Sequence, residues 1–362
     1  MEDNRINLLK TLSELNGPSG YEEEVRNFMR EALDPLVDQI DVDQMGSIIG
    51  RLGVKDNPRI MLSAHMDELG LMVRYITEEG YLKIHPLGGW LDQAIVNQRW
   101  IILTDKGTVP GITGIKTIHV MKAEDRKKVF DRDSLFIDIG AKNREDVIKN
   151  YGIRPGDAIV PDSKFGLLGD GDLLLGKAWD DRVGLAVMIE VLRRIAKSEV
   201  TIDKTIYFVA TVQEEIGLRG AKTSSYAVSP DIAINLEAGV AADFPGMNND
   251  ESQERLGLGP TVFLHDSSMI PNIKLRKFVM EVAENEKIPI QFNVLNGYGQ
   301  DGAEAQRSRS GTPAINIAVP TRYLHSHNGV ISMSDFDQTV QLITALMQKM
   351  NSDEIKNIRQ FV

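Results

Sequence analysis

The sequence predicts an α/β protein that carries a smaller, β-rich inserted domain. Short apolar segments typical of buried strands alternate with helical segments near the N-terminus and in the second half of the chain, which predicts a sheet covered by helices on both faces. From about Leu69 to Lys164 the pattern changes to short alternating strands and many turns. We therefore expect one domain formed by residues 1–68 and 165–362, and an insert formed by residues 69–164.

The elements of the larger domain follow from hydrophobic periodicity. Short apolar segments with polar or turn residues on either side are predicted strands: RIMLSAH (59–65), TIYFVATVQ (205–213), DIAINLE (231–237) and PAINIAV (313–319). Apolar residues at three- and four-residue spacing predict helices at 182–198, 272–287 and 335–350. The N-terminal segment MEDNRINLLKTLSEL is predicted to form an amphipathic helix.

The insert is predicted to consist mainly of short strands joined by turns. The candidate strands lie in LMVRYITEEGYLKIHPLGGW (71–90), QRWIILTDKGTVPGITGI (98–115), SLFIDIG (134–140) and GDAIV (156–160). Only NREDVIKNYG (143–152) has a helical pattern in this part of the chain. An insert of this kind is best explained as a second domain that the chain enters and leaves once.

Composition restricts the possible functions. The 362 residues carry a net charge of −11, which argues against general binding to nucleic acid or to an anionic membrane. There is no cysteine, so disulfides, thiolate metal sites and thiol nucleophiles are excluded. The N-terminal segment is too charged for a signal peptide, and no run of about 18 apolar residues is present to span a bilayer. We therefore predict a cytoplasmic protein.

The candidate reactive residues lie at the ends of predicted strands or just before a predicted helix. Ligands of open α/β sheets bind at the carboxyl ends of the strands. The sequence places imidazole and carboxylate side chains at four such ends and a pair of aspartates before the helix at 182–198: His65, Glu214, Glu215, Glu237, His325, Asp180 and Asp181. Distant parts of the chain are therefore expected to meet at one edge of the sheet.

Each of these residues also has a simpler interpretation when it is considered alone. Asp180 or Asp181 is a suitable N-cap for the following helix, and a single histidine at a strand end is more often structural than a ligand. The pair Glu214 and Glu215 could form a solvated turn, and Glu237 could pair with an arginine. These separate structural roles do not explain, however, why all of the residues are predicted to lie at the same edge of the sheet.

Electrostatics favours a metal centre at this edge. Two carboxylates about 4 Å apart repel by roughly 4 kcal/mol at an effective dielectric constant of about 20. Several of them in one pocket therefore need cations, and two divalent ions that share a carboxylate fit the available side chains. Mixed imidazole and carboxylate ligands suit zinc, cobalt or manganese. Of two adjacent glutamates, one can bind metal while the other moves a proton, which is the chemistry of amide hydrolysis.

These motifs resemble those of a known family, the binuclear metallo-aminopeptidases that include TET peptidases, bacterial glutamyl aminopeptidases and cellulase M-like proteins. The resemblance rests on SAHMDELG, GKAWDDRVG, TVQEEIGLRGA and QDGAEAQRSRSGTPAINIAVPTRYLHS, in this order and spacing. In the insert, PLGGW, VPGITG, LFIDIGA and GIRPGDAIV also fit. The resemblance implies a zinc-peptidase-like α/β/α sandwich and hydrolysis of N-terminal residues from peptides.

Carried over residue by residue, the resemblance implies the ligands of two ions, zinc or cobalt with manganese as a third candidate. His65, Asp180 and Glu237 would hold the first ion. Asp180 would bridge to the second ion, which Glu215 and His325 would complete. In relatives the insert mediates dimerisation, and dimers assemble into hollow dodecamers, so a homo-oligomer is expected.

The resemblance also implies two catalytic residues. Glu214 would act as general base and acid, and Asp67 would orient the ligand imidazole of His65.

Two features depart from the pattern of the family. The family more often has aspartate at the position of Glu237, and its HSP-like ending is HSH here, which makes His327 a weak competitor of His325. The remaining histidines, His85, His119 and His265, are not expected to be ligands.

A glycoside hydrolase and a non-catalytic binding protein are the alternatives to the peptidase. A glycoside hydrolase needs two carboxylates and no metal, which leaves His65 and His325 without a role. A non-catalytic protein that binds metal or peptide and serves in an assembly is encouraged only by Glu237 and is opposed by Glu214. The aminopeptidase is therefore the favoured function.

Overall fold

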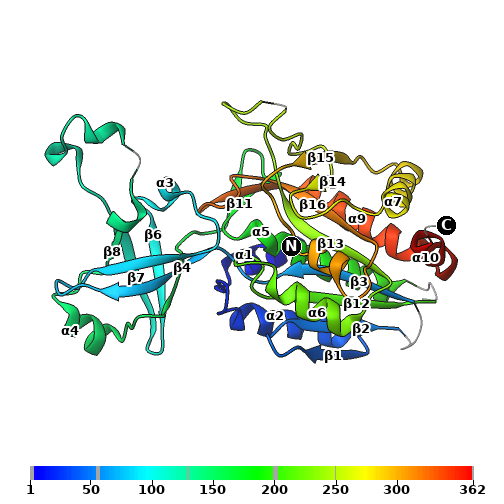
Figure 1. Cartoon of the computed structure of the whole chain (residues 1–362), viewed down its shortest axis with the longest axis horizontal. Coiled ribbons are helices and arrows are strands. Elements are labelled where there is room, and N and C mark those ends of the chain that lie inside the picture. The colour runs from blue at the N-terminus through cyan, green and yellow to red at the C-terminus, as the bar shows by residue number, and fades with distance from the viewer. Residues whose placement is uncertain (1–3, 54–57, 129, 199–202, 249, 361–362) are drawn as a thin grey trace.

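A large sheet covered by helices and a separate closed barrel make up the structure (Figure 1). The computed structural model describes residues 4–53, 58–128, 130–198, 203–248 and 250–360. Within these residues the sheet has eleven strands and the barrel has six. The barrel has a hydrophobic cluster of its own, distinct from the two clusters that flank the sheet. The predicted fold class, an α/β protein with an inserted β-rich domain, is confirmed.

Four parallel strands form the centre of the sheet, and they correspond to the four predicted strands. In spatial order they are β12 (Thr205–Thr211), β3 (Arg59–His65), β13 (Ile232–Val240) and β16 (Ala314–Arg322). β12 ends two residues before the predicted end, whereas β13 and β16 each continue three residues further. The register pairs Thr211 with His65 and Glu237 with Ala318, so the carboxyl ends of the four strands lie at one edge of the sheet.

Shorter strands that the sequence did not predict extend the sheet on both sides. They pair antiparallel to their neighbours, except that β15 runs parallel to β14. These strands are β1 (Gln39–Val42), β2 (Ile48–Leu52), β10 (Gly166–Leu168), β11 (Leu173–Gly176), β14 (Thr261–Asp266), β15 (Gln291–Leu295) and β17 (Gly329–Ser332).

Helices cover both faces of the central strands. In β3, Ile60 and Leu62 belong to the larger hydrophobic cluster, and Met61 between them belongs to the smaller one, because successive side chains point to opposite faces. The larger cluster contains residues of α1 (Asn4–Glu14), α2 (Glu23–Leu33), α5 (Trp179–Lys197), α7 (Ile273–Glu286), α9 (Met333–Lys349) and α10 (Ser352–Arg359). The smaller cluster contains residues of α6 (Arg219–Val228) and α8 (Gly302–Arg307).

The barrel is formed by antiparallel strands between β3 and α5. Its closed order is β4 (Gly70–Ile76), β5 (Leu82–Leu87), β8 (Phe136–Asp138), β7 (Gly107–Gly114), β6 (Arg99–Thr104) and β9 (Ala158–Pro161). Trp100, Ile137 and Ile159 are fully buried in its core. The predicted boundaries of the inserted domain, residues 69 and 164, stay a prediction.

The predicted helical segment of the insert is present and is not the only one. Residues 143–152 form α4 (Arg144–Asp146), which continues into a π-helical turn at Val147–Tyr151. The sequence did not predict α3 (Asp92–Ile95) or the short 3₁₀ turns at Ile118–Val120, Asp125–Lys127 and Arg132–Ser134. A further 3₁₀ turn, Asp34–Leu36, follows α2.

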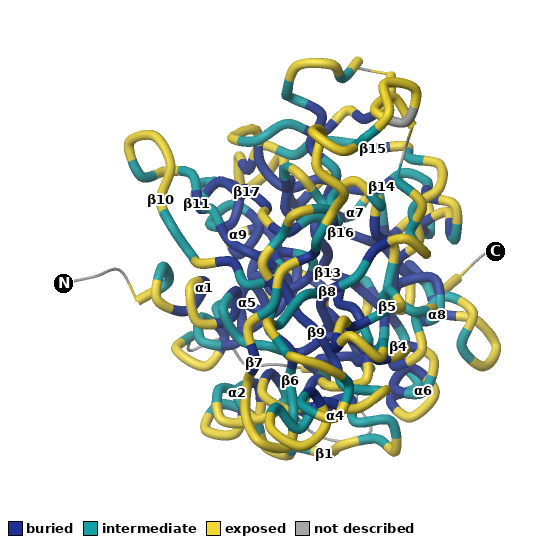
Figure 2. Tube along the Cα trace, turned by 90° about the vertical axis from the view of Figure 1, so that its left-hand side faces the viewer, coloured by how far each residue is buried: buried dark blue, intermediate teal, exposed yellow. Residues whose placement is uncertain are grey.

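Burial is concentrated in the sheet and in the helices that touch it (Figure 2). The central strands β13 and β16 are buried at all but their last residue, whereas β7 of the barrel alternates and is largely accessible. No helix within the described part of the chain is both long and apolar enough to cross a membrane.

Candidate metal centre

The carboxyl edge of the sheet brings the predicted reactive residues together. His65 is the last residue of β3, Glu237 lies in β13, and Glu214 and Glu215 follow β12 after a two-residue extension. His325 follows β16. Ligands of α/β proteins bind at this edge of the sheet. The structure therefore places all of these side chains where the sequence predicted them to meet.

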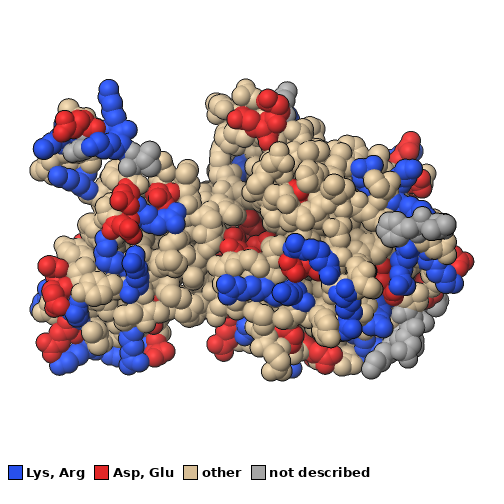
Figure 3. All heavy atoms as spheres, in the orientation of Figure 1, with Lys and Arg blue, Asp and Glu red and all other residues tan. Residues whose placement is uncertain are grey.

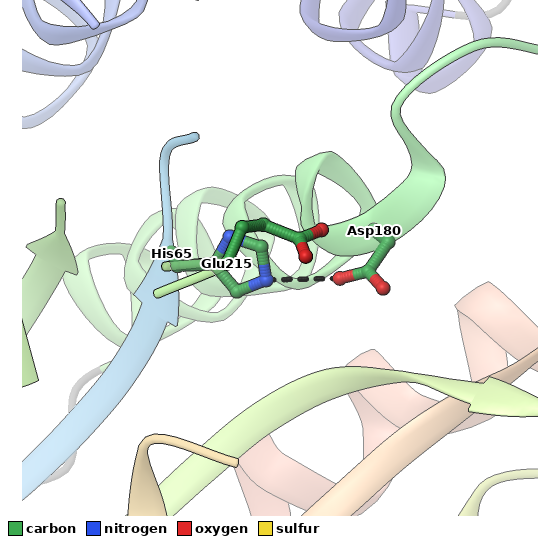
Figure 4. A group of neighbouring side chains, drawn as sticks. All are labelled: His65, Asp180 and Glu215. Carbon is green, nitrogen blue, oxygen red and sulfur yellow. Dashed lines mark hydrogen bonds and ion pairs between the residues drawn. The ribbon is translucent and has the colours of Figure 1, made fainter. Parts of the chain in front are cut away.

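His65 lies at the centre of the cluster and is completely buried. Its Nε2 atom is 2.9 Å from Oδ1 of Asp180 (Figure 4) and 3.4 Å from Oε1 of Glu237. Its Nδ1 atom is 3.0 Å from the backbone carbonyl oxygen of Asp67. A carbonyl oxygen only accepts hydrogen bonds, so Nδ1 carries a proton, and Nε2 is the ring nitrogen that faces the carboxylates and would bind a cation.

The two adjacent aspartates have different surroundings. Asp181 accepts hydrogen bonds from the backbone N–H of Gly184 at 3.0 Å and of His65 at 3.2 Å, so its carboxyl caps α5 and supports the end of β3. Asp180 instead points at His65 and His325, and Figure 4 shows its contact with His65. The peptide bond between the two aspartates is cis. The N-cap interpretation thus applies to Asp181, while the carboxylate of Asp180 is left for the site.

His325 completes the other side of the cluster. Its Nε2 atom is 3.4 Å from Oδ2 of Asp180 and 3.7 Å from Oε2 of Glu215. Its Nδ1 atom donates a hydrogen bond to the carbonyl oxygen of Gly89, at 2.8 Å, which belongs to the loop after β5 of the barrel. The barrel therefore fixes the ring orientation of one of the two site histidines.

Glycines in the barrel loop allow this close approach. A Cβ atom on Gly89 would lie 3.2 Å from Nδ1 of His325. A Cβ atom on Gly88, whose φ of +92° favours glycine, would lie 2.2 Å from the Leu69 side chain and 3.1 Å from Oε2 of Glu215. Any side chain at these two positions would press on the site.

Asp67 acts mainly on the loop that carries the two glutamates. Its carboxylate accepts the backbone N–H groups of Glu214 at 2.9 Å and of Glu215 at 3.1 Å, and the hydroxyl of Ser19 at 2.6 Å. The distance from its Oδ1 to Nδ1 of His65 is longer, 3.5 Å. The shorter contact to His65 comes from the Asp67 backbone, so the carboxylate holds the glutamate loop more directly than it holds the imidazole.

The carboxyl groups are too crowded to be ionised together. Burial, together with the charge of Asp180, raises the pKa of Glu215 and of Glu237 to about 8. Burial likewise raises the pKa of Glu214 well above its usual value, with Glu237 and Glu215 contributing. Although burial opposes it, Glu215 and Asp180 raise the pKa of His325 to about 10. The carboxyl groups outnumber the two imidazoles, so the cluster needs further positive charge before all of its carboxyl groups can ionise.

The side chains present fit divalent cations. His65, Asp180 and Glu215 offer ligand atoms within 4.8 Å of one another, and so do His65, Asp181 and Glu237. Oε1 of Glu215 and Oε2 of Glu237 are buried and have no hydrogen-bond partner. Buried carboxylate oxygens without a partner are costly, and a cation is the group that would satisfy them. Imidazole and carboxylate together suit zinc, cobalt or manganese.

A cleft of about 260 Å³ opens above the cluster. It lies in the hollow between the barrel and the larger body, where acidic side chains gather at the bottom (Figure 3). Its lining residues are Gly89, Asp180, Glu214, Glu215, Gly217, Leu218, Glu237, Gly297, Tyr298, Gly299 and His325. The cleft gives solvent and substrate a path to the carboxylates.

Sequence analysis missed one buried acid near the site. Asp301 is the residue before α8, and one of its oxygens accepts a hydrogen bond from the Thr211 hydroxyl at the end of β12. Its other carboxylate oxygen has no partner. Burial raises its pKa to about 6, and its charge in turn raises the pKa of Glu214 and of Glu237. The motif QDGAEAQRS, quoted for the family resemblance, contains this residue but gave no indication of its role.

The other histidines lie away from the carboxylate cluster. Nε2 of His327 donates to the carbonyl oxygen of Arg99 at 3.0 Å, and its ring lies 4.2 Å from Trp100 and 5.7 Å from Trp90. Burial lowers its pKa to about 4, so this side chain is neutral. His85 and the 3₁₀ residue His119 belong to the barrel, and His265 contacts the backbone of Met269.

The fold and the cluster together define a class of protein, a metal-dependent hydrolase. The M42 glutamyl aminopeptidase family matches residues 46–342. FrvX of Escherichia coli (strain K12) is 37% identical over 357 residues, which are 98% of this chain and 98% of that protein. Lysyl aminopeptidase of Pyrococcus furiosus is 33% identical over 350 residues, which are 95% and 96% of the two chains.

Solved structures lead to the same family. The TET aminopeptidase of Thaumarchaeota archaeon SCGC AB-539-E09 superposes with a TM-score of 0.96 at 39% identity, over 98% of this chain and 99% of that one. The TET1 peptidase of Pyrococcus horikoshii superposes with a TM-score of 0.86 at 31% identity, over 96% and 100%. The chain belongs to the M42 glutamyl aminopeptidase family. Its activity is that of an aminopeptidase, which sets aside the glycosidase and the non-catalytic protein.

Proposed function

We propose that this aminopeptidase works with two divalent ions that share Asp180. His65, Asp180 and Glu237 would hold the first ion, and Asp180, Glu215 and His325 would hold the second. The observation that supports this proposal is the position of the Asp180 carboxylate, whose Oδ1 is 2.9 Å from Nε2 of His65 and whose Oδ2 is 3.4 Å from Nε2 of His325. A carboxylate with one oxygen toward each imidazole is suited to bridge two ions.

Glu237 in place of the shorter aspartate is compatible with this arrangement. Its Oε1 atom lies 3.4 Å from Nε2 of His65 and accepts the backbone N–H of Ala238 at 3.1 Å, which leaves its buried Oε2 available. The additional methylene is therefore accommodated within the strand end. Zinc or cobalt are the proposed ions, with manganese as a third candidate.

Glu214 is the proposed general base and acid. Bound divalent ions supply Lewis acidity, which lowers the pKa of water and polarises a peptide carbonyl. Glu214 lines the cleft, and its Oε2 atom lies 4.0 Å from Nε2 of His65, beside the proposed ligands. Its carboxylate accepts the proton of the attacking water and then donates it to the leaving amine. Asp67 keeps Glu214 in place through the backbone N–H bond.

The proposal is tested by separating metal binding from proton transfer. Glu214→Gln should retain two ions per chain, measured by elemental analysis, while the turnover of an aminoacyl p-nitroanilide falls by about 100-fold or more, because Gln cannot accept the proton. Wild-type protein stripped with EDTA should lose activity and regain it with zinc, cobalt or manganese. Unchanged turnover of Glu214→Gln would contradict the assigned role, and one ion per wild-type chain would contradict the shared Asp180.

We also propose that the chain forms homo-oligomers through the barrel, with a dodecamer as the final assembly. TET1 peptidase of P. horikoshii assembles into a tetrahedron or a large octahedral shell. Large apolar side chains are exposed on the barrel, both before α3 and in and after β7, which is typical of an interface. They are Leu91, Ile112, Ile115, Ile118 and Val120. Light scattering after size-exclusion chromatography distinguishes a monomer of 40.3 kDa from dimers and larger assemblies.

A further inference from the structure

The cleft above the candidate metal centre is lined by acidic side chains, one imidazole, and glycines and other uncharged residues. Its carboxylate and imidazole lining residues are Glu214 and four of the five proposed ligands, Asp180, Glu215, Glu237 and His325. Its other lining residues are uncharged, and four of them are glycines: Gly89, Gly217, Leu218, Gly297, Tyr298 and Gly299. Among the residues that the structure describes, no lysine or arginine lines the cleft.

We propose that the cleft selects an uncharged, apolar N-terminal side chain and disfavours glutamate and aspartate, with Tyr298 and Leu218 as the residues that determine this specificity. The proposal rests on the two-ion centre proposed above, because that centre fixes the charge of the cleft. It names a substrate class that differs from the glutamyl residue in the name of the family.

Charge balance in the cleft argues against a charged substrate side chain. Two divalent ions carry four positive charges, and the carboxylates of Asp180, Glu214, Glu215 and Glu237 compensate them. A glutamate side chain of the substrate would add a buried negative charge without a partner. A lysine side chain would likewise find only carboxylates that already have partners. Unpaired buried charge is strongly unfavourable, whereas an apolar side chain gains from leaving water.

Tyr298 forms a fixed apolar wall. Its hydroxyl donates to the carbonyl oxygen of Ala238, the residue after Glu237, and its backbone carbonyl oxygen accepts from the N–H and the hydroxyl of Ser267 at 2.9 and 2.7 Å. Its ring stacks on Phe263 with centroids 5.7 Å apart. Tyr298 is partly accessible, lines the cleft and has a glycine on either side in the chain. Because its hydroxyl is already bonded, Tyr298 offers substrate an aromatic surface rather than a polar group.

Leu218 supplies the second apolar side chain from the loop of the two glutamates. The N–H groups of Gly217 and Leu218 both donate to the carbonyl oxygen of Glu214, at 2.9 and 2.8 Å, so the position of Leu218 follows that of the proposed base. The next residue, Arg219, is exposed and is not part of the lining. In Figure 3 the basic side chains near the hollow lie on the outer surface, and its bottom is acidic.

The proposal is tested with a panel of aminoacyl p-nitroanilides on the metal-loaded protein. We expect kcat/KM for leucine, methionine and phenylalanine to exceed that for glutamate and lysine by about 10-fold or more, the discrimination that apolar contacts provide. Tyr298→Ala should raise KM for the apolar substrates about 10-fold with little change in kcat, while Tyr298→Phe, which keeps the ring, should remain within about threefold of wild type. Leu218→Arg should raise relative activity toward glutamate.

Other outcomes would overturn the proposal. These are a preference of the wild type for glutamate or lysine, or equal effects of Tyr298→Ala on all substrates. A glutamate preference that disappears in Arg219→Ala would assign recognition to Arg219 instead. Calorimetric binding of free leucine and free glutamate to the metal-loaded protein gives a readout that needs no turnover. If no substrate is hydrolysed, the proposed function fails, and leucine binding no tighter than glutamate would separately overturn the proposed specificity.

Discussion

The two site histidines reach Asp180 from different surroundings. His65 ends a central strand, has 1% of its side chain exposed, and is held by the backbone of Asp67 two residues away. His325 follows a strand, adopts a left-handed φ of +56°, has 33% of its side chain exposed, and is held by Gly89 of the barrel loop. One half of the centre is thus built into the core, and the other half depends on contact between two bodies.

This difference indicates that the two proposed ions are held with unequal rigidity. A ligand whose position is fixed by a buried strand keeps its geometry without metal, whereas a ligand on an exposed loop is positioned by its contacts. We expect the His65 half to bind its ion more tightly and the His325 half to respond to changes in the barrel.

The largest effect is expected from a substitution of Asp180, the residue common to both halves of the centre. Asp180→Asn should lose both ions and reduce activity by on the order of 1,000-fold, because the bridging charge is gone. Asp181→Asn is the matched control. The carboxyl of Asp181 accepts the backbone N–H groups of Gly184 and His65 and caps α5, so this variant should keep both ions at a cost of about 1 kcal/mol in stability. Equal metal loss in both variants would remove the distinction between the two aspartates.

Alanine substitutions of the two histidines compare the halves directly. His65→Ala should lower the free energy of unfolding of the metal-free protein by about 2–3 kcal/mol, since it opens a cavity in the core. His325→Ala should lower it by less than about 1 kcal/mol, because that ring is partly exposed. Elemental analysis should find one remaining ion in His325→Ala. Similar destabilisation by both substitutions would show that the two surroundings are equivalent.

A smaller effect is expected from the barrel contact alone. In Gly89→Ala the new methyl group would lie 3.2 Å from Nδ1 of His325 and would displace the ring by a few tenths of an ångström. Activity should fall by about 3- to 10-fold, with weaker binding of the second ion, because misplaced ligands reduce catalysis. Gly166→Ala, where a Cβ atom meets nothing within 4 Å, is the control and should behave as wild type. Loss of the first ion instead would reverse the assignment of the halves.

The smallest expected effect concerns a buried acid behind the His65 half. Glu254 accepts a hydrogen bond from Asn293 at 2.6 Å, and its carboxyl packs against Gly239 in β13. Burial raises its pKa to about 7. Because the folded-state pKa is raised, the protonated group stabilises the fold fully below the unfolded-state value, and this contribution is lost as pH rises through about 7.

Glu254→Gln should therefore flatten the pH dependence of stability. Between pH 5 and pH 8 this group accounts for up to about 3 kcal/mol of the decrease in the free energy of unfolding. Urea unfolding at the two pH values with saturating metal, so that the site carboxylates do not titrate, measures the difference. An unchanged slope in the variant would show that Glu254 does not titrate in this range.

The sequence predicted the parts of the site that depend on local pattern. β3 has the predicted bounds, and His65 falls at its end, because a short apolar segment with a turn after it specifies a buried strand and its edge. The shared sheet edge of His65, Glu237 and His325 then follows from parallel pairing. The outer strands were missed because they are short and their pairing is decided by the neighbouring strand.

The missed contacts are tertiary and have no local signal. The bonds from Asp67 to the backbone of Glu214 and Glu215 join residues about 147 positions apart. The contact between Gly89 and His325 spans 236 positions. His327 was predicted to be a weak competitor for metal, because its spacing from His325 does not show that its ring is enclosed by Trp90 and Trp100.

The insertion point of the barrel has a consequence for folding. His65 and Asp180 are 115 residues apart, and most of the intervening chain, from β4 to β9, forms the barrel. Closing a long flexible segment costs entropy, and a barrel with its own core shortens that segment when it folds. We therefore expect the barrel to fold early and to bring together the two parts of the larger domain that it separates in the sequence. Slowing its folding should delay assembly of the centre without altering any of its ligands.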